Sequence, residues 1–504
     1  RLSLVGSEMC IRDRLEFRLY KMNYKEIFVA VNSAALMLST VSCGAKEEAV
    51  PKPNIIILLA DDLGYNDVSC YRNENFPQQS DSFPTSQTPN LDLLARQGIR
   101  FTNFYCGAAV SSPSRAALMT GRNCTRTGVY NYLEQNSPMH LRDSEVTIAE
   151  VLKQADYATG HFGKWHLSSG RPDQPYPNDQ GFDYSFYALN NSVPSHHNPT
   201  NFFRNGEPQG EIEGYSCDIV VTEALQWLDK NKQEPFFLNV WFNEPHFPME
   251  APEELKKRHA INPEYYGCIE NMDIAIGKLM NYLKEQNLED NTIVIFASDN
   301  GSQWDYSNLP FRGEKHFNYE GGLRVPCIVR WHKHVPTGVI SEFNGCFTDI
   351  LPTLASLADA PVPTDRVIDG MDISPVFLGK AETLERENPL FFFRYIHDPI
   401  CMIREGDWCL LGYDEPLPWA FSLDELALGK VKPWYLTKEH MEFAKKVFPK
   451  YFELYNLRDD REERIDVADK HPEIVARLKS KMLKLKQEVV AEGGDWFAED
   501  VDER

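Results

Sequence analysis

The stretch NIIILLADD, residues 54–62, decides the fold of this chain. Its apolar part contains three successive isoleucines, and the acidic residues Asp61 and Asp62 follow it directly. A short apolar run without polar alternation is typical of a strand that is buried on both faces, as in a parallel sheet. Polar residues after such a strand favour a functional crevice at the carboxyl edge of the sheet.

Three further runs repeat this pattern. Each is short, apolar and rich in β-branched or aromatic residues, and polar functional side chains follow each one: residues 157–162 precede Lys164 and His166, residues 236–242 precede His246, and residues 292–297 precede Asp299 and Asn300. Helical periodicity separates the runs, for example behind the capping-box spacing of Thr147 and Glu150. This alternation up to about residue 380 predicts an α/β fold with a large, mostly parallel central sheet flanked by helices.

The sequence changes character after Gly379. Strand candidates at 389–395 and 400–411 precede a Pro/Trp-rich loop around Trp419 and Trp434, and a charged helix is expected near 472–488. This order predicts a smaller antiparallel sheet with a closing helix. We therefore expect a catalytic domain over 53–380 and a C-terminal subdomain over 381–504.

The N-terminal region is interpreted as targeting sequence. Residues 1–21 are treated as a sequence artefact, and residues 22–42 form a lipoprotein-type signal peptide whose apolar stretch is too short for a permanent membrane span. The motif around Cys43 resembles a bacterial lipobox, with an ordinary secretory signal as the alternative, and residues 43–52 form a linker.

These features predict secretion across the inner membrane and membrane attachment only through a lipid on Cys43. The product would be a periplasmic or outer-membrane lipoprotein. The acidic residues Glu47 and Glu48 after Lys46 resemble the export tag of surface-exposed lipoproteins, which extends the prediction to the cell surface.

Composition narrows the function classes. The 504 residues are 42% hydrophobic and 25% charged, as in globular proteins. The 52 Lys and Arg residues against 74 Asp and Glu residues give a net charge of −22, which argues against nucleic-acid binding. The eleven cysteines lack zinc-site or disulfide-framework spacing. An anionic substrate would therefore need a local cationic pocket.

The segment SSPSRAALMTGR, residues 111–122, predicts an anion-binding helix start. Pro113 suits the first turn of a helix, so Ser111 lies at or just before its N-terminus. Free backbone N–H groups gather there, and Arg115 adds a cation one turn further on. For an isolated motif of this kind, an ordinary capped helix is an equal alternative.

Four residues after two of the predicted strands offer oxygen ligands for a metal ion. These are Asp61, Asp62, Asp299 and Asn300. Carboxylate and amide oxygens suit Ca²⁺ or Mg²⁺ better than a thiophilic metal. For the Asp61-Asp62 pair alone, a helix cap or a solvated turn is the alternative.

The S-x-P-S-R and L-M-T-G-R motifs of residues 111–122 resemble the signature of the type I sulfatases. Further motifs of that family occur in order up to residues 454–457: the Asp pair, GKWH at 163–166, PH at 245–246, SDNG at 298–301, FRGEK at 311–315 and EGGLRVP at 320–326. The chain is similar to N-acetylgalactosamine-6-sulfatase-like and arylsulfatase A-like bacterial proteins. The resemblance implies an alkaline-phosphatase-like sandwich fold.

The resemblance also implies the nucleophile and the cofactor. In the family, the residue at the Ser111 position is oxidised to formylglycine (3-oxoalanine), whose hydrate attacks sulfur and later expels sulfate as the aldehyde re-forms. A serine at this position implies a serine-type maturation enzyme as a partner. The implied metal is Ca²⁺, with Mg²⁺ as the alternative, and the modified Ser111 would join its ligands.

The remaining catalytic roles follow from the same resemblance. Lys164 and Lys315 would bind sulfate oxygens, and Arg115 completes the pocket. His166 would act as the base that releases sulfate. His246, with Lys315, would protonate the leaving alcohol.

Four further residues are candidates for substrate binding. His196 and His197 lie in a Pro/Asn-rich loop, and Trp304 and Arg312 lie between the SDNG motif and Lys315. For the two histidines, a solvated loop is the alternative. Substrate specificity is also expected from the loops around 171–215 and 302–318 and from the C-terminal subdomain, including Arg394 and His397.

We therefore predict a sulfatase that acts on sulfated glycans of the glycosaminoglycan type. One alternative is a phosphate or phosphonate esterase of the same fold, although the chain shows no second metal-ligand set for the two zinc ions such enzymes use. The other is a glycan-binding lipoprotein whose Ser111 is never oxidised. The intact mass of Ser111 distinguishes the binder from the sulfatase.

Overall fold

The structure, a computed structural model, describes residues 52–75, 85–415 and 436–498. These described residues belong to one compact unit. The predicted signal peptide, the lipidation site Cys43 and the tryptophans Trp419 and Trp434 lie outside the described residues.

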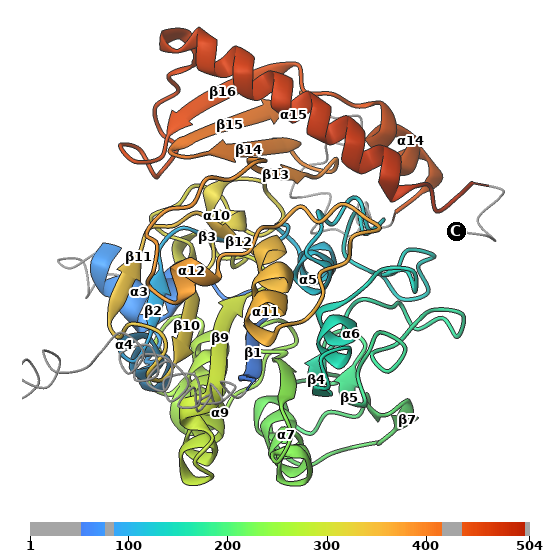
Figure 1. The fold of residues 1–504 in the computed structure, drawn as a ribbon, viewed down its shortest axis with the longest axis vertical. Helices are drawn as coiled ribbons and strands as arrows, with labels where there is room; N and C mark the ends of the chain where they lie inside the picture. The colour runs from blue at the N-terminus through green and yellow to red at the C-terminus, as the bar shows by residue number, and fades with distance from the viewer. Residues whose placement is uncertain (1–51, 76–84, 416–435, 499–504) are drawn as a thin grey trace, which may run out of the picture. The chain divides into compact units, whose positions relative to one another are not determined.

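A ten-stranded sheet forms the centre of this unit (Figure 1). Its spatial order is β11 (Val339–Ser341), β2 (Ile99–Phe101), β10 (Cys327–Trp331), β9 (Thr292–Ser298), β1 (Asn54–Ala60), β8 (Phe236–Trp241), β4 (Ala158–Lys164), β5 (Tyr184–Ala188), β6 (Phe202–Arg204) and β7 (Glu207–Pro208). Strands β9, β1, β8, β4 and β5 are parallel, whereas β10 runs antiparallel to β9 and β2. The predicted large, mostly parallel sheet is confirmed, and each of the four apolar runs is one of its strands.

Helices cover both faces of this sheet because its central strands are apolar on both sides. Ile55, Ile57 and Leu59 of β1 belong to one core cluster, and the alternating residues belong to the other. The first face is covered by α5 (Ser111–Thr120), α6 (Ile148–Lys153), α11 (Ile350–Ala358) and α12 (Ser374–Phe377). The second is covered by α3 (Ser69–Asn75), α4 (Pro89–Arg96), α7 (Ser216–Asn231) and α9 (Pro263–Glu285), with α8 (Glu253–Lys256) packed on α9.

Short elements connect these layers. Thr147 and Glu150 form the predicted capping box, in which Glu150 N donates to Thr147 Oγ1 and Thr147 N donates to Glu150 Oε2. The remaining short elements are α10 (Glu320–Leu323), the two-stranded sheet of β3 (Phe104–Tyr105) and β12 (Gly345–Cys346), and the 3-10 turns η1 (Tyr65–Asp67), η2 (Glu289–Asn291), η3 (Asp305–Ser307), η4 (Phe347–Asp349) and η5 (Ala468–Lys470).

A separate antiparallel sheet follows in the chain, at the top of Figure 1. Its order is β13 (Leu390–Phe393), β14 (Cys401–Glu405), β15 (Trp408–Tyr413) and β16 (Tyr451–Asn456), and it carries α14 (Lys438–Lys446) and α15 (Pro472–Gly493). The small sheet and closing helix are as predicted. The single strand candidate at 400–411 is two strands, because Gly406 turns the chain with a φ of +59°.

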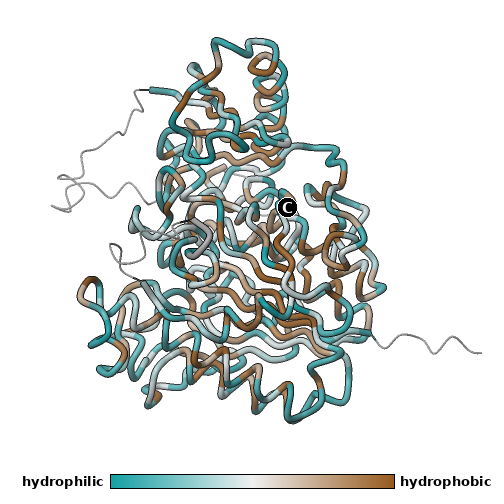
Figure 2. The backbone as a smooth tube through the Cα atoms, turned by 90° about the vertical axis from the view of Figure 1, so that its left-hand side faces the viewer, coloured by the Kyte–Doolittle hydropathy of each residue, from teal (hydrophilic) through white to brown (hydrophobic). Residues whose placement is uncertain are grey.

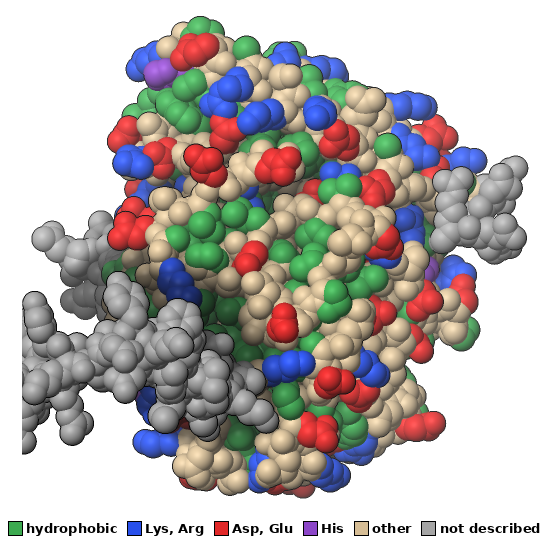
Figure 3. Space-filling model, in the orientation of Figure 1, with side chains coloured by type: hydrophobic (Ala, Val, Ile, Leu, Met, Phe, Trp, Pro, Cys, Tyr) green, Lys and Arg blue, Asp and Glu red, His purple; other side chains and the backbone are tan. Residues whose placement is uncertain are grey.

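Apolar segments are concentrated in the interior of the tube, and hydrophilic segments are commoner at its periphery (Figure 2). On the face shown in Figure 3, acidic and basic side chains are interspersed. None of the described helices combines the length and the apolar composition that a bilayer crossing requires.

Candidate active site

Neighbouring parallel strands bring the predicted residues to one edge of the sheet. Strands β9, β1, β8 and β4 are adjacent, and their carboxyl ends carry Asp299 and Asn300, Asp61 and Asp62, His246, and Lys164 and His166. All of these side chains except His246 are buried. This crevice is where the strand-end pattern in the sequence predicts it.

Ser111 lies at the start of a helix that points at this edge. It is the first residue of α5 and follows the extended N-cap residue Val110. Its Oγ lies 3.2 Å from Asp61 Oδ1, to which it donates, and 3.5 Å from Asn300 Oδ1. The helix N-terminus and the oxygen-bearing residues that follow β1 and β9 therefore meet at Ser111.

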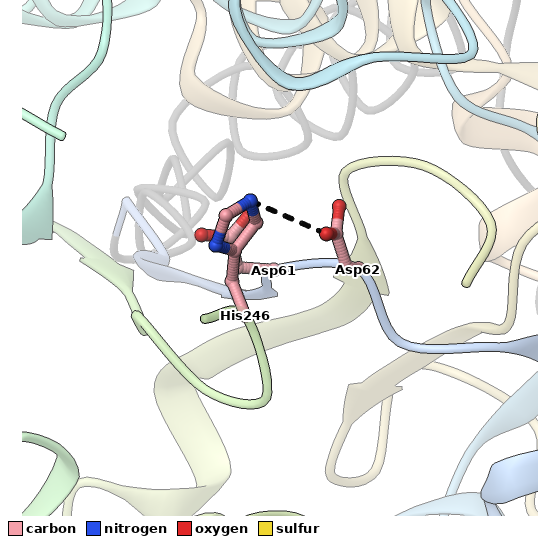
Figure 4. A group of neighbouring side chains, drawn as sticks. All are labelled: Asp61, Asp62 and His246. Atoms are coloured by element: carbon pink, nitrogen blue, oxygen red, sulfur yellow. Dashed lines mark ion pairs between the residues drawn. The ribbon is translucent and has the colours of Figure 1, made fainter. Parts of the chain in front are cut away.

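Three groups close to one another could hold a metal ion: Asp61, Asp62 and His246 (Figure 4). Asp62 N donates to Asp299 Oδ1 at 3.1 Å, and Asn300 Nδ2 donates to Asp62 Oδ1 at 2.7 Å. Asp62 has a φ of +64°, a left-handed conformation that Asp tolerates better than most residues. This backbone turn allows the side chains of Asp61 and Asp62, although adjacent in sequence, both to contact residues of the crevice.

The electrostatics of these carboxylates favour a bound cation. Burial and the neighbouring Asp61 raise the pKa of Asp299 to about 7. Burial would also raise the pKa of Asp61, but the nearby cationic side chains, led by Lys164, hold it well below its usual range. A cluster of hard oxygen donors under mutual repulsion suits Ca²⁺ or Mg²⁺, so the residues present fit the implied metal.

Two lysines pair with the carboxylates that follow β1. Lys164 Nζ donates to Asp61 Oδ2 at 2.6 Å and to Asn191 Oδ1 at 3.0 Å. Lys315 Nζ donates to Asp62 Oδ2 at 2.6 Å and to His246 Nε2 at 3.2 Å. The acidic chain thus holds a local pair of ammonium groups, as an anionic substrate requires.

Arg115 lies beneath the crevice. Its side chain is fully buried, and its Nε and Nη2 donate to Asp299 Oδ2 at 3.1 and 2.8 Å. Its Nη1 donates to Lys164 O at 3.1 Å, and the guanidinium lies over the ring of Trp241. The donors of Arg115 therefore hold Asp299 and Lys164 in place.

Burial disfavours the protonated form of both predicted catalytic histidines. Burial, reinforced by Lys315, lowers the pKa of His246 to about 4, and its Nδ1 donates to Phe247 O at 2.7 Å. Burial and Lys164 hold the pKa of His166 well below its usual range. His166 Nε2 donates to Leu133 O at 3.0 Å, and its buried Nδ1 has no hydrogen-bond partner among the described residues, so a lone pair is available there.

The four weaker candidates lie in two kinds of surroundings. His196 is buried 3.8 Å from Glu244 Oε1 and 3.4 Å from Cys268 Sγ, whereas His197 is partly exposed and packs on Tyr215.

Trp304 stacks on Tyr306, and Arg312 contacts Tyr319 and Tyr455. No hydrogen bond of Trp304 or Arg312 within the described residues reaches the strand-end carboxylates. Their part in substrate binding stays a prediction.

The structure adds residues that sequence reasoning missed. Asn191 contacts Lys164, and its place in the Pro/Asn-rich loop was the available signal. Leu133 contacts both His166 and Ser112 through its backbone, which no sequence pattern marks. Arg394, by contrast, is one of the residues that the sequence leads us to expect in substrate specificity; it approaches from the C-terminal sheet and donates to His316 O.

Comparisons with known proteins agree with this geometry. Residues 53–360 match the family model described as Sulfatase. N-acetylgalactosamine-6-sulfatase of Canis lupus familiaris is 33% identical over 390 residues, covering 71% of this chain and 72% of that protein. Arylsulfatase A of Homo sapiens is 35% identical over 385 residues, covering 69% of this chain and 72% of that protein.

Solved structures show the same fold. Ps i-CgsB in complex with k-i-k-neocarrahexaose has a TM-score of 0.71 and 29% identity over 86% of this chain and 93% of that one. A structure from work on glycosaminoglycan metabolism by Bacteroides thetaiotaomicron has a TM-score of 0.69 and 27% identity over 86% and 99%. The phosphonate monoester hydrolase of Agrobacterium radiobacter, at 20% identity and a TM-score of 0.60 over 87% and 96%, shares the fold.

Proposed function

The chain belongs to the sulfatase family and is a sulfuric ester hydrolase, and from this premise we propose that it removes sulfate from carbohydrates by way of a formylglycine formed at Ser111. The predicted family, enzyme class and alkaline-phosphatase-like fold are confirmed. The substrate class, the modified residue and the metal are the proposed part.

One observation carries the proposal. Ser111 Oγ lies 3.2 Å from Asp61 Oδ1, and Lys164 Nζ lies 2.6 Å from the other oxygen of the same carboxylate. A nucleophile position, a hard-oxygen ligand and an ammonium group thus converge on one carboxylate. Such a site suits transfer of a group that carries negative oxygens.

Two groups that the chain must acquire complete this site. Oxidation of Ser111 by a serine-type maturation enzyme would supply a hydrated aldehyde that serves as nucleophile and as the route for sulfate release. Ca²⁺, with Mg²⁺ as the alternative, would be held by Asp61, Asp62, Asp299, Asn300 and the modified Ser111, and would supply Lewis acidity toward the sulfate oxygens.

The residues of the chain then divide the proton transfers. Neutral His166, with its available Nδ1 lone pair, is suited to take a proton from the hydroxyl at position 111 when sulfate leaves. Lys315 Nζ donates to neutral His246 Nε2, so this pair holds a proton for the leaving alcohol. Lys164 and Lys315 would bind the sulfate oxygens as substrate charge replaces part of their present pairing.

The carbohydrate assignment is supported by relatives. Ps i-CgsB was solved with a neocarrahexaose, and the Bacteroides thetaiotaomicron structure comes from work on glycosaminoglycans.

We further propose that the chain is exported and anchored through a lipid on Cys43 as a periplasmic or outer-membrane lipoprotein. Globomycin treatment of the native host and the mass of the mature N-terminus test that anchor.

The test of function is sulfate release from 4-nitrocatechol sulfate and a panel of sulfated sugars, using protein co-expressed with a serine-type maturation enzyme. We expect release that is absent in Ser111→Ala, and a Ser111 peptide that is lighter by two hydrogens. Failure to release sulfate from any member of the panel, with Ser111 shown to be oxidised, would contradict the carbohydrate assignment. An unshifted peptide in active protein would contradict the formylglycine.

A further inference from the structure

A buried side chain at the edge of the small antiparallel sheet, that of Arg394, contacts two loops that border the crevice. This residue directly follows β13 and is 2% exposed. Its Nη1 donates to His316 O at 2.6 Å, and its Nη2 donates to Asn131 Oδ1 at 3.1 Å. One planar guanidinium thus joins two loops that lie 185 residues apart in the chain, from 131 to 316.

The loop around His316 forms the Lys315 side of the crevice. His316 follows Lys315, whose ammonium group contacts Asp62 and His246. The backbone N of His316 donates to Ala109 O at 2.8 Å, two residues before Ser111. His316 has a φ of +83°, a left-handed conformation that a non-glycine residue keeps only when its surroundings hold it.

The loop around Asn131 lies on the His166 side of the crevice. Asn131 is fully buried and lies two residues before Leu133. Leu133 O accepts from His166 Nε2 at 3.0 Å, and Leu133 N donates to Ser112 Oγ at 3.0 Å. A shift of Asn131 would therefore displace Leu133, and with it the hydrogen-bond partners of His166, the proposed base, and of Ser112 at the start of helix α5.

The chemistry of arginine suits this bridging position. Its donors lie in a rigid fork, so two acceptors on different loops are held at a fixed separation by a single group. A hydrogen bond from a charged donor to a buried carbonyl is also stronger than a neutral one. A lysine could satisfy one of the two acceptors well, but it could not impose the same geometry on both.

We propose that Arg394 is a positioning residue that sets the distance between Lys315 and the Ser111–His166 side of the crevice. It acts through His316 and Asn131 and does not touch the sulfate. The small sheet is then required for turnover as well as for stability. The inference rests on the roles proposed above for Lys315 and His166.

The test compares Arg394→Met and Arg394→Lys with the matured full-length protein on 4-nitrocatechol sulfate, a small substrate that reports on the crevice alone. Displacement of catalytic groups by about 1 Å costs on the order of 100-fold, so we expect kcat of Arg394→Met to fall by about 10- to 100-fold while KM changes by less than about threefold. Arg394→Lys should recover part of that loss.

Arg404→Met is the matched control. Arg404 is 3% exposed, lies on β14 of the same sheet and packs over Tyr105, and its hydrogen bond goes to Gly406 O. We expect Arg404→Met to lose stability but to keep kcat within about twofold of wild type. An equal loss of kcat in this variant would show general loosening of the sheet and would overturn the proposal.

Amide hydrogen exchange gives a readout that does not depend on turnover. In Arg394→Met, peptides containing residues 131–133 and 315–317 should exchange faster, and in Arg404→Met they should not. Wild-type kcat together with unchanged exchange in folded Arg394→Met overturns the proposal. If Arg394→Met does not fold, Asn131→Leu serves instead, because it removes one acceptor of the Arg394 guanidinium and should also lower kcat. A wild-type kcat in Asn131→Leu would overturn the proposal as well.

The two proposals fail in different ways. If wild-type protein with oxidised Ser111 releases no sulfate from any tested substrate, the proposed function is at fault. The exchange data would still decide whether Arg394 holds the two loops.

Discussion

The crevice and the contact region between the two sheets both bury several charged side chains. Both hold a carboxyl whose pKa is raised to about 7, Asp299 in the crevice and Glu320 in the contact region; they differ in Asp61, whose pKa is lowered. In the crevice, Asp61 stays ionised because Lys164 and other cationic groups outweigh its burial. In the second region, which we call the seam, Glu320 of α10 meets Glu463 from beyond β16, with Arg324 and Arg404 beside them. Burial raises the pKa of Glu320 to about 7 and that of Glu463 well above its ordinary value.

The difference shows what distinguishes a site from a structural cluster. Glu320 accepts from Tyr105 OH at 2.8 Å and from Arg324 Nη1 at 2.9 Å, so its oxygens are occupied by the protein itself. In the crevice, oxygens of several carboxylates face one another beside a helix N-terminus, and a base nitrogen of His166 has no partner among the described residues. Buried charge alone therefore does not mark function; carboxylates that converge beside a helix N-terminus and near an unpartnered base nitrogen do.

The largest expected contrast comes from Ser111→Ala. Loss of a covalent nucleophile typically lowers kcat by on the order of 10⁴-fold or more, so sulfate release should fall to background. Thermal unfolding should change little, because a single hydroxyl is removed. Measurable turnover in this variant, with contaminating sulfatase excluded, would place the nucleophile elsewhere.

Removal of the metal should affect the crevice and spare the seam. Dialysis against a chelator should lower kcat by about 10³-fold or more, since charge stabilisation by a metal contributes several kcal/mol. Adding Ca²⁺ should restore the rate and raise the melting temperature, because the ion binds the folded state. A chelated protein with full activity would contradict the metal, and restoration by Mg²⁺ alone would reassign it.

Lys315→Met should have a smaller effect, of about 10²- to 10³-fold on kcat/KM, as expected for loss of one group that stabilises transferring charge. The seam variant Arg404→Met is the comparison, with kcat/KM near that of wild type. Steady-state kinetics on 4-nitrocatechol sulfate separates the two. Equal losses in both variants would mean that the crevice has no special dependence on its own cations.

Much of the crevice could be predicted because its residues lie at strand ends. The apolar run before Asp61 and the one before Asp299 predict two parallel strands, and β1 and β9 are indeed neighbours. The order of the strands, and the antiparallel direction of β10, could not be predicted, because pairing depends on contacts that no local pattern encodes. The contact between Arg394 and His316 could not be predicted for the same reason, since the two residues lie 78 positions apart; the sequence marks Arg394 only as an expected specificity residue.

Arg312 illustrates the opposite limit. It lies three residues before Lys315, which made it a candidate for substrate binding, but its guanidinium contacts Tyr319 and Tyr455. A short separation in sequence keeps the backbone of Arg312 near that of Lys315, but it does not determine where the long side chain of Arg312 points. The seam could likewise not be predicted from the sequence, because Glu320 and Glu463 come into contact only in the folded chain.

The smallest effect is expected at the seam, in the pH dependence of stability. Glu320 has an ordinary pKa of 4.5 and a folded-state pKa of about 7, so the folded state binds this proton more tightly. Its contribution to the free energy of unfolding is therefore complete below about pH 4.5 and is lost as the pH rises to about 7. The loss should be on the order of 2 kcal/mol, after allowing for coupling to Glu463.

Glu320→Gln should remove this dependence while kcat stays within about twofold of wild type. Urea unfolding at pH 5 and pH 8 should then show that the variant gains stability relative to wild type as the pH rises. Glu463→Gln should shift in the same direction, and the double variant should shift by less than the two single changes together, because the two carboxyls share one titration. Parallel pH profiles for Glu320→Gln and wild type would mean that the seam holds an ordinary ionised carboxylate, and the contrast with the crevice would then rest on geometry alone.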